Sequence, residues 1–374
     1  MALIVGVLKE TFPEERRVAL TPKAFDVLKK LNAEVWVEKD AGAQAGIPDA
    51  DYAAKGAHIG SADEVRQHAT VLLHVRVPLP TSGHTSIGFC DPLSSPDLAA
   101  KFAAAGATLF SMELVPRISR AQSMDALSSM ASIAGYKAVI LAADTLPRLF
   151  PMMTTAAGTI PPARVLIIGA GVAGLQAIAT ARRLGAVVSG FDVRAAVKEQ
   201  IESLGAKFVN INLGGAKAEG EGGYAKALDD DALRLQREQM SAFMREQDVV
   251  ITTAAIPGKR APILITREMV HAMAPGSVIV DLAAERGGNC ELTKFGETVI
   301  ERGVTILGPA NLPATVPYHA SQMYARNLVT FLKHLVKEGK LNIDTNDEIT
   351  RETLISYQGE VVHPKIQALL GVNV

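Results

Sequence analysis

The feature of this 374-residue chain that most constrains its fold is the glycine-rich loop between residues 169 and 174. The loop reads GAGVAG, follows the apolar run VLII at residues 165–168 and opens a stretch with helical spacing. In such a loop the first glycine makes a tight turn, the second lets the backbone approach a pyrophosphate, and the third permits close packing of helix on strand. Asp192 ends the next strand-like run about 20 residues on, where the dinucleotide-binding fingerprint has an acidic residue. The sequence therefore predicts a dinucleotide site.

The predicted site has two components, the glycine loop and the end of the following strand. The loop places the pyrophosphate at the positive end of a helix. A carboxylate at residue 192 accepts a hydrogen bond from a ribose 2′-OH and repels a 2′-phosphate, which favours NAD(H) as the cofactor. Arg194 can be interpreted as a phosphate ligand or as a solvated or ion-paired side chain. The residues expected to contact NAD(H) are Gly169, Ala170, Gly171, Val172, Gly174, Asp192, Val193 and Arg194.

Strand-like and helix-like stretches alternate along the chain, which is typical of parallel sheets covered by helices. A chain of this length is also too long for one hydrophobic core. We therefore expect an α/β protein with two Rossmann-like, doubly wound parallel-sheet domains joined by long helices. The runs that predict strands are 3–8, 33–38, 71–77 and 108–111 in the first domain, and 165–168, 187–191, 207–209, 249–253, 278–282 and 305–307 in the second.

Two long helices predict the domain boundaries. Residues 122–143 contain no proline and read as one helix, after which prolines between 147 and 162 indicate a linker. A second helix over 319–337 is expected to return to the first domain, which a short helix or hairpin in the last thirty residues completes. The predicted domains are residues 1–130 with 320–374, and the NAD(H)-binding domain 131–319.

Composition excludes several classes of protein. The net charge of −1 does not suggest a nucleic-acid surface. Cys90 and Cys290 lie in no CxxC pattern, which argues against a disulfide framework or a zinc site and fits a reducing cytoplasm. The N-terminus lacks the basic and cleavage regions of a signal peptide. The uncharged run 165–181 is shorter than the roughly 20 residues of a membrane span, so no transmembrane segment is expected.

Several segments resemble a family that includes alanine dehydrogenases and proton-translocating nicotinamide nucleotide transhydrogenases. These segments are ERRVALTP at 15–22, GY at 135–136, the GAGVAG loop, IPGK at 256–259, GGNC at 287–290 and NLP at 311–313. Residues 115–130 are similar to the NAD-binding component of the transhydrogenases. There the resemblance implies an Arg-Gln-Asp-Ser set over the nicotinamide ring, here Arg117, Gln122, Asp125 and Ser128. The alternative is a cluster that caps the long helix, with Ser119 or Ser123 as the cap.

A second segment, the glycine-rich stretch 213–226, resembles the mobile loop of the transhydrogenases. The resemblance implies that Tyr224 folds over the bound nucleotide, and a surface excursion is the alternative.

The resemblance also separates the two activities of the family. Oxidation of an amino acid requires a general base. Alanine dehydrogenases supply a lysine in a KVKEP-like segment and a histidine downstream, whereas this chain has HVRVP at 74–78 and no histidine in 86–92. Arg17 and Glu285, which match alanine dehydrogenase positions, keep that activity open, with His74, Arg76 or His84 as the replacement base. Hydride transfer between two nicotinamides needs no base, and His74 is then assigned no role.

The resemblance therefore implies the NAD(H)-binding subunit of a transhydrogenase whose membrane component is a separate chain. Its expected partners are an NADP(H)-binding subunit and a membrane proton-channel subunit, and the family implies a homodimer on the cytoplasmic face of the inner membrane. The alternatives are an NAD-dependent alanine or other amino-acid dehydrogenase and, more distantly, a non-catalytic NAD-sensing module.

Overall fold

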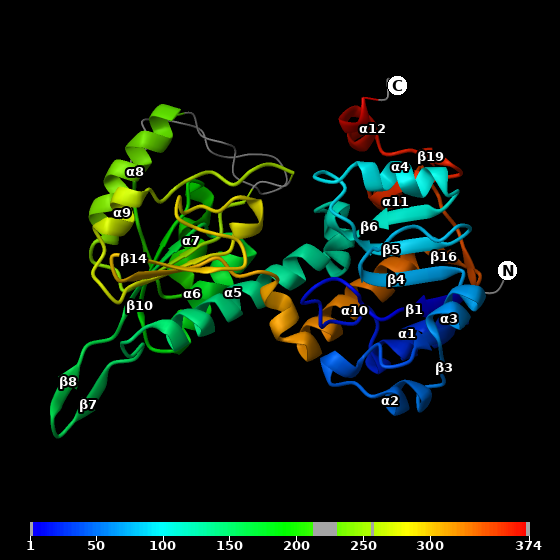
Figure 1. Ribbon diagram of the computed structural model, residues 1–374, viewed down its shortest axis with the longest axis horizontal. Helices are drawn as coiled ribbons and strands as arrows, with labels where there is room; N and C mark the ends of the chain where they lie inside the picture. The colour runs from blue at the N-terminus through cyan, green and yellow to red at the C-terminus, as the bar shows by residue number, and fades with distance from the viewer. Residues whose placement is uncertain (1–2, 212–229, 256–257, 372–374) are drawn as a thin grey trace. The chain divides into compact units, whose positions relative to one another are not determined.

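The computed structural model describes residues 3–211, 230–255 and 258–371, and the chain divides into two compact units (Figure 1). Unit 1 comprises Met1–Met130 and Pro313–Val374, and unit 2 comprises Ala131–Leu312. The chain enters unit 2 within the long helix α5 (Ala126–Thr145) and returns to unit 1 at Pro313, whereas the sequence analysis placed the return at residue 320. Each unit is described by itself.

Unit 1 contains a sheet in the order β19-β18-β6-β5-β4-β1-β2-β3. The strands β1 to β6 are parallel to their neighbours, and β18 and β19 add an antiparallel edge. The sequence did not predict β3 or β5, because neither shows a long apolar run. The strands are β1 (Ile4–Val7), β2 (Glu34–Glu38), β3 (His58–Gly60), β4 (Val71–Arg76), β5 (Thr85–Phe89), β6 (Thr108–Ser111), β18 (Leu354–Tyr357) and β19 (Glu360–Val361).

The longest helix wholly within unit 1 is α10 (Pro317–Leu335), which begins with proline at a position that tolerates the missing N–H. Its apolar face is buried, with Tyr324, Leu328 and Phe331 inaccessible to solvent. The ring of Phe331 packs edge-on against Phe110 of β6, so α10 joins the sheet core. The other helices of unit 1 are α1 (Phe25–Lys30), α2 (Asp49–Ala53), α3 (Ala62–His68), α4 (Asp97–Ala104), α11 (Glu348–Thr353) and α12 (Pro364–Leu370), with a small hairpin of β16 (Val336–Lys337) and β17 (Lys340–Leu341).

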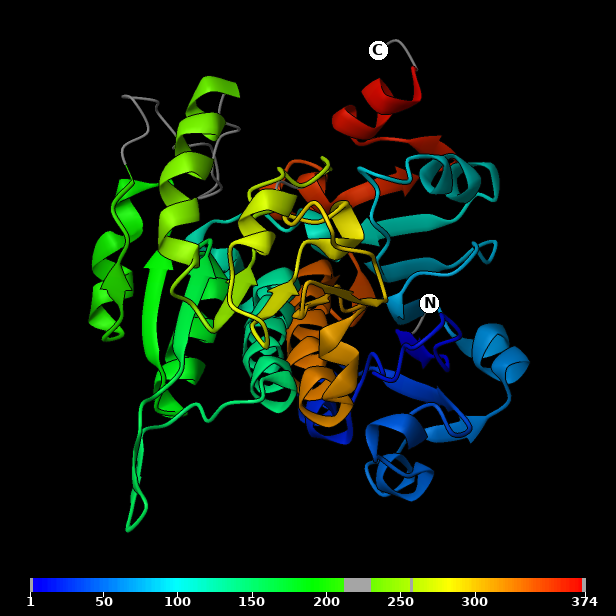
Figure 2. The ribbon, with the colours of Figure 1, turned by 60° about the vertical axis from the view of Figure 1, so that its left-hand side comes forward.

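Unit 2 contains a sheet in the order β11-β10-β9-β12-β13-β15-β14, visible in Figure 2. The order reverses between β9 and β12, which makes the carboxyl ends of these strands the switch point where doubly wound sheets bind ligands. The strands are β9 (Arg164–Ile168), β10 (Val187–Phe191), β11 (Lys207–Phe208), β12 (Val249–Thr252), β13 (Val278–Asp281), β14 (Thr298–Glu301) and β15 (Val304–Leu307), of which β14 is antiparallel. The helices are α6 (Val172–Arg183), α7 (Lys198–Ser203), α8 (Asp230–Met244) and α9 (Arg267–His271).

Helices cover both faces of the unit 2 sheet, as the continuous apolar run of β9 predicts. Val165 and Ile167 belong to one core cluster and Leu166 and Ile168 to another. Successive side chains of the strand therefore fill opposite cores, and the predicted α/β architecture is confirmed.

The two segments that link the predicted domains differ from the sequence prediction. The long helix begins at Ala126, because residues 119–124 form the 3₁₀ helix η4 (Ser119–Met124). Residues in the proline-rich linker form a hairpin of β7 (Met153–Thr155) and β8 (Gly158–Ile160) whose strands are exposed throughout.

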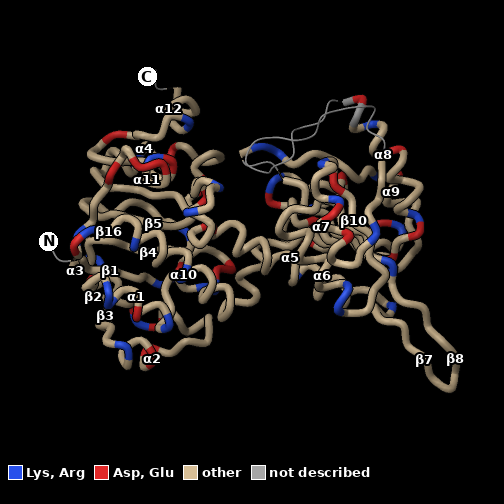
Figure 3. Tube along the Cα trace, turned by 180° about the vertical axis from the view of Figure 1, so that it is seen from behind, with Lys and Arg blue, Asp and Glu red and all other residues tan. Residues whose placement is uncertain are grey.

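Among the described residues, α5 is the one helix that is long and apolar enough to span a membrane by length and composition. Ala138, Val139 and Ala142 of this helix lie in the core of unit 2, where they pack with residues of α6 and β9. The helix therefore has the packing of a core helix. Figure 3 shows acidic and basic residues interspersed over both units.

Candidate functional site

The three glycines of the loop after β9 each meet a distinct steric demand. Gly169 has a φ of +97°, a backbone conformation that disfavours side chains. A Cβ on Gly174 would lie 1.8 Å from the carbonyl oxygen of Gly169, so only glycine allows α6 to start so close to the strand. A Cβ on Gly171 would have no described atom within 4 Å, which leaves open space beside the loop. The loop therefore has the shape that a pyrophosphate requires.

The beginning of α6 adds the electrostatic component of this cradle. Gly171 is the N-cap residue and has no side chain to bind the N–H groups of the first turn. Val172, the first residue of the helix, is 38% exposed. The N–H groups at a helix start favour an anion, so the predicted phosphate position is chemically sound.

Asp192 follows β10 and joins the glycine loop to Arg194. Its Oδ2 accepts a hydrogen bond of 2.7 Å from the Ala170 N–H, and its Oδ1 accepts one of 2.9 Å from the Arg194 N–H. The Arg194 guanidinium bonds both carboxylate oxygens, at 2.9 and 2.8 Å. Burial opposes ionisation of this carboxyl, but the bonds from Arg194 and Ala170 prevail and hold its pKa below the usual value. Of the two interpretations of Arg194, the structure has the ion-paired one. Val193 lies between them and is half-buried.

A second buried carboxylate organises the strand ends on the other side of the switch point. Asp281, at the end of β13, accepts hydrogen bonds from the Thr252 hydroxyl at 2.9 Å and from the Asn289 N–H at 2.7 Å. The Asn289 side chain in turn bonds the N–H and the carbonyl of Ala254, at 3.0 and 2.8 Å. This pair fixes the chain after β12 beside the glycine loop, where Thr253 donates to the Gly169 carbonyl. The sequence analysis found residues 287–290 only by resemblance, because Asp281 carries no motif of its own.

The helix α5 approaches the start of α6 at Gly135. A Cβ at this position would lie 2.0 Å from the carbonyl oxygen of Ala173. The Gly135-Tyr136 pair that the sequence analysis noted is therefore a packing requirement of the cradle.

The set predicted to act on the nicotinamide lies in unit 1, between η4 and the first turn of α5. Asp125 accepts hydrogen bonds from the N–H of Ser128 at 2.8 Å and from its hydroxyl at 2.6 Å. Asp125 is therefore the N-cap of α5, and neither Ser119 nor Ser123 has that role. The structure thus brings Asp125 and Ser128 together, while Arg117 and Gln122 are exposed on the segment before them.

The residues that could replace the missing base of an amino-acid dehydrogenase are poorly suited to it. Burial lowers the pKa of His74 to about 3, so this side chain stays neutral and is a weak base. Both ring nitrogens of His84 lie against backbone carbonyl oxygens, of Ser82 at 2.9 Å and of Arg66 at 2.7 Å. Arg76 lies 3.7 Å from the Glu15 carboxylate. None of the three has the properties of a general base at neutral pH.

One acidic residue that the sequence analysis did not single out lies near this group. Glu10 follows β1, and its carboxylate accepts hydrogen bonds from the Val75 and Arg76 N–H groups at 2.7 and 3.1 Å. Burial raises its pKa to about 7. Arg17, the other residue that matches alanine dehydrogenases, forms a buried pair with Glu15 at 2.6 Å. Glu10 carries no motif, so only its position beside β4 indicates a role.

Two further predicted residues add little. Tyr224 lies outside the described residues. Glu285 lies in a 3₁₀ turn after β13 (Ala284–Arg286) and is exposed.

The fold and the glycine cradle define a two-domain dinucleotide-binding protein of the Rossmann type. Two family models match the chain, the alanine dehydrogenase/PNT N-terminal domain over residues 6–134 and the alanine dehydrogenase/PNT C-terminal domain over residues 138–364. The chain belongs to the alanine dehydrogenase/PNT family.

Relatives within this family distinguish its two branches. The chain is 46% identical to the first of the separate chains that make up NAD(P) transhydrogenase subunit alpha of Rhodospirillum rubrum, with 97% of this chain and 98% of the relative covered. It is 44% identical to NAD(P) transhydrogenase subunit alpha of Haemophilus influenzae, with 97% and 72% covered. Alanine dehydrogenase of Bacillus subtilis is 27% identical, with 99% and 95% covered.

Solved structures agree with these relatives. A transhydrogenase from Sinorhizobium meliloti superimposes with a TM-score of 0.85 at 45% identity, covering 96% of this chain and 99% of that one. An L-alanine dehydrogenase superimposes with a TM-score of 0.83 at 25% identity, covering 99% of each chain. The fold is thus common to both branches, and sequence identity favours the transhydrogenases.

Proposed function

We propose that this chain is the NAD(H)-binding component of a proton-translocating transhydrogenase, and that it presents NADH for direct hydride transfer to NADP⁺ on a partner subunit. One observation carries the proposal. Unit 2 has a complete dinucleotide cradle, whereas His74, Arg76 and His84 of unit 1 lack the properties of a base at neutral pH. The identity of 43–46% to transhydrogenase alpha subunits supports it.

The chemistry of the reaction fits a site without a base. Bound NADH supplies a hydride from C4 of its dihydronicotinamide, and no substrate proton moves. Catalysis then depends on proximity and orientation. Arg117 and Gln122 are the side chains proposed to orient the carboxamide and the ring, and the Asp125–Ser128 pair is a fixed hydrogen-bonding group at the start of α5.

The proposal requires partners. An NADP(H)-binding subunit supplies the hydride acceptor, and a membrane subunit couples the reaction to proton movement, so this component would lie at the cytoplasmic face of the inner membrane. A homodimer is also proposed. The exposed β7–β8 hairpin supports it, because Met152, Met153 and Ile160 expose 63, 42 and 47% of their surface.

A second candidate, an NAD-dependent amino-acid dehydrogenase, is favoured by one observation. The Glu10 carboxyl has a pKa of about 7, which suits proton transfer at neutral pH. Glu10 is also close to the paired Arg17 of the family signature in the sequence. This candidate therefore needs a direct test.

One assay separates the candidates. Purified protein is mixed with NAD⁺ and L-alanine, and NADH absorbance is followed. The protein is then mixed with NADH, an oxidised NAD analogue, NADP⁺ and an NADP-binding transhydrogenase domain, and reduction of the analogue is followed. Turnover only with the partner domain supports the proposal, whereas NADH formation with alanine supports the dehydrogenase. NADH binding without turnover in either mixture would leave a sensing module.

A further inference from the structure

The segment that displays the proposed nicotinamide residues is a short 3₁₀ helix, η4, flanked by Arg117 and Asp125. It has no side-chain hydrogen bond at its N-cap. A 3₁₀ helix has poorer hydrogen-bond geometry than an α-helix. The orientation of Arg117 and Gln122 therefore depends on what holds η4 to the rest of unit 1.

Some of this support comes from α10. Ala121 and Met124 of η4 are buried. The side-chain amide of Asn327, on α10, donates a hydrogen bond of 2.9 Å to the Ser123 carbonyl. This anchor fixes the C-terminal half of η4.

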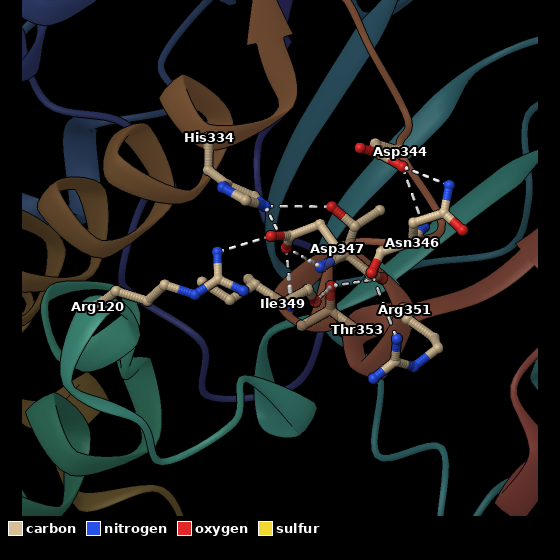
Figure 4. Close-up of polar contacts among 9 residues, drawn as sticks. Arg120, His334, Asp344, Asn346, Asp347, Ile349, Arg351 and Thr353 are labelled. Atoms are coloured by element: carbon tan, nitrogen blue, oxygen red, sulfur yellow. Dashed lines mark hydrogen bonds and ion pairs between the residues drawn. The ribbon is translucent and has the colours of Figure 1, made fainter.

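The N-terminal half has a different anchor, Asp347, which lies 227 positions from Arg120 in the chain. The Arg120 guanidinium donates a 2.6 Å hydrogen bond to Asp347 Oδ2. Figure 4 shows Asp347 between Arg120 on one side and His334 of α10 on the other, with His334 Nε2 at 3.0 Å from Asp347 Oδ1. Arg120 is the contact of Asp347 that comes from η4.

The Asp347 carboxylate is itself held in place. It is the N-cap of α11 and accepts hydrogen bonds from the Ile349 and Thr350 N–H groups at 2.9 and 3.2 Å. The bond from Arg120 and the helix N–H groups outweigh partial burial and lower its pKa, so it is ionised at neutral pH. Arg120 thus meets a fixed charge, which avoids much of the side-chain ordering that weakens ordinary surface ion pairs.

We propose that Asp347, acting through Arg120, is a positioning residue for hydride transfer. It holds η4 so that Arg117 and Gln122 are presented to the nicotinamide. The inference rests on the proposed function. Its energetic contribution to folding is small, because Arg120 is half-exposed, and its effect is on the geometry of the site.

The test uses the full chain with the NADP-binding partner domain. Asp347→Asn keeps the N-cap of α11, because asparagine caps as well as aspartate, but it removes the charge that holds Arg120. Arg120→Met removes the other partner. Asp344→Asn is the matched control, since Asp344 lies in the same loop and its Oδ1 contacts Asn346.

Asp347→Asn and Arg120→Met are each expected to lower the single-turnover hydride-transfer rate roughly tenfold and to leave the NADH dissociation constant within about twofold. The double variant should be no slower than either single one, because both remove the same contact. Hydrogen exchange at the Ala121 and Asp125 amides, which bond within η4 and its flanks, should quicken in both variants.

Two results would overturn the inference. A rate for Asp347→Asn equal to that of Asp344→Asn would remove the positioning role while the proposed function stood. A loss of NADH affinity or of thermal stability without a separate loss of rate would show a structural role only. If the wild-type complex transferred no hydride, the proposed function would fail, and this inference with it.

Discussion

Asp192 binds Arg194 with both carboxylate oxygens, at 2.9 Å from Nε and 2.8 Å from Nη2, and the same carboxylate accepts the N–H of Ala170 in the glycine loop. One acidic side chain therefore shapes the phosphate cradle and neutralises the nearest predicted cation. Because Arg194 is paired, its charge is not available to a ribose 2′-phosphate.

Removal of this carboxylate is expected to shift nucleotide preference. Asp192→Asn should weaken NADH binding at least about tenfold and strengthen NADPH binding, because Arg194 is released and the repulsion of a 2′-phosphate is lost. Calorimetric dissociation constants for both nucleotides measure the ratio. The double variant Asp192→Asn with Arg194→Gln should lose the gain in NADPH affinity. An unchanged NADPH constant in the single variant would contradict the role of Arg194.

The loop glycines form a matched pair that separates binding from folding. Gly171→Ala should be tolerated by the fold, because its φ is −76° and a Cβ there meets no described atom within 4 Å. It should nevertheless lower NADH affinity at least about tenfold, because the methyl group enters the space for the pyrophosphate. Gly174→Ala should instead destabilise the fold by about 3 kcal/mol, since its Cβ would overlap the Gly169 carbonyl. Urea unfolding and NADH titration of both variants check this, and equal behaviour of the two would contradict it.

How much the sequence could predict depends on how local each feature is. The glycine loop was predictable, because each glycine answers to its own turn or its immediate neighbour. The α/β class was also predictable, since buried parallel strands are continuous apolar runs. The start of α5 was not, because Ser119, Ser123 and Asp125 are all capping residues, and only the folded chain shows that Asp125 binds the N–H of Ser128.

Features made by distant segments could not be predicted. The anchoring of Arg120 by Asp347 joins residues far apart in the chain, and neither belongs to a motif. Likewise nothing in the sequence near Glu10 shows that β4 will cover it. The hairpin between Met153 and Ile160 was read as a linker, because prolines surround it and its strands bury no side chain.

The role proposed for Arg117 predicts a separation of rate from affinity. Arg117→Gln should slow hydride transfer to the partner-bound NADP⁺ roughly a hundredfold while NADH binds almost as before, because a misplaced ring reacts slowly. Single-turnover kinetics and NADH titration measure the two quantities. Arg16→Gln, at an exposed arginine of the same unit, is the control. A loss of affinity alone would exclude the positioning role.

The hairpin predicts how the protein associates. Replacing Met153 and Ile160 by serine should shift a homodimer toward monomer, because these exposed side chains would lose the apolar surface that a partner copy covers. Sedimentation velocity over a range of concentrations measures the shift. Leu79→Ser, at a 70% exposed leucine outside the hairpin, is the control. A hairpin variant that sediments as the wild type does would remove this surface from the interface.

Glu10 predicts a pH dependence of stability with a definite sign. Burial raises its folded pKa from an ordinary 4.5 to about 7, so between these values the unfolded chain releases a proton that the folded chain retains. The free energy of unfolding contributed by Glu10 therefore falls as pH rises through this window, by roughly 3 kcal/mol, and stays low above it.

The variant Glu10→Gln isolates this contribution, because glutamine keeps an acceptor oxygen near the Val75 and Arg76 N–H groups and does not titrate. Urea unfolding at several pH values should show the wild type losing stability relative to Glu10→Gln between about pH 4.5 and 7. Glu14→Gln, at an exposed glutamate four residues on, should follow the wild type throughout. A constant difference between wild type and Glu10→Gln across this window would mean that the Glu10 carboxyl is ionised at neutral pH. The observation that favours an amino-acid dehydrogenase would then be lost, because an already ionised, fully hydrogen-bonded carboxylate is a weak base.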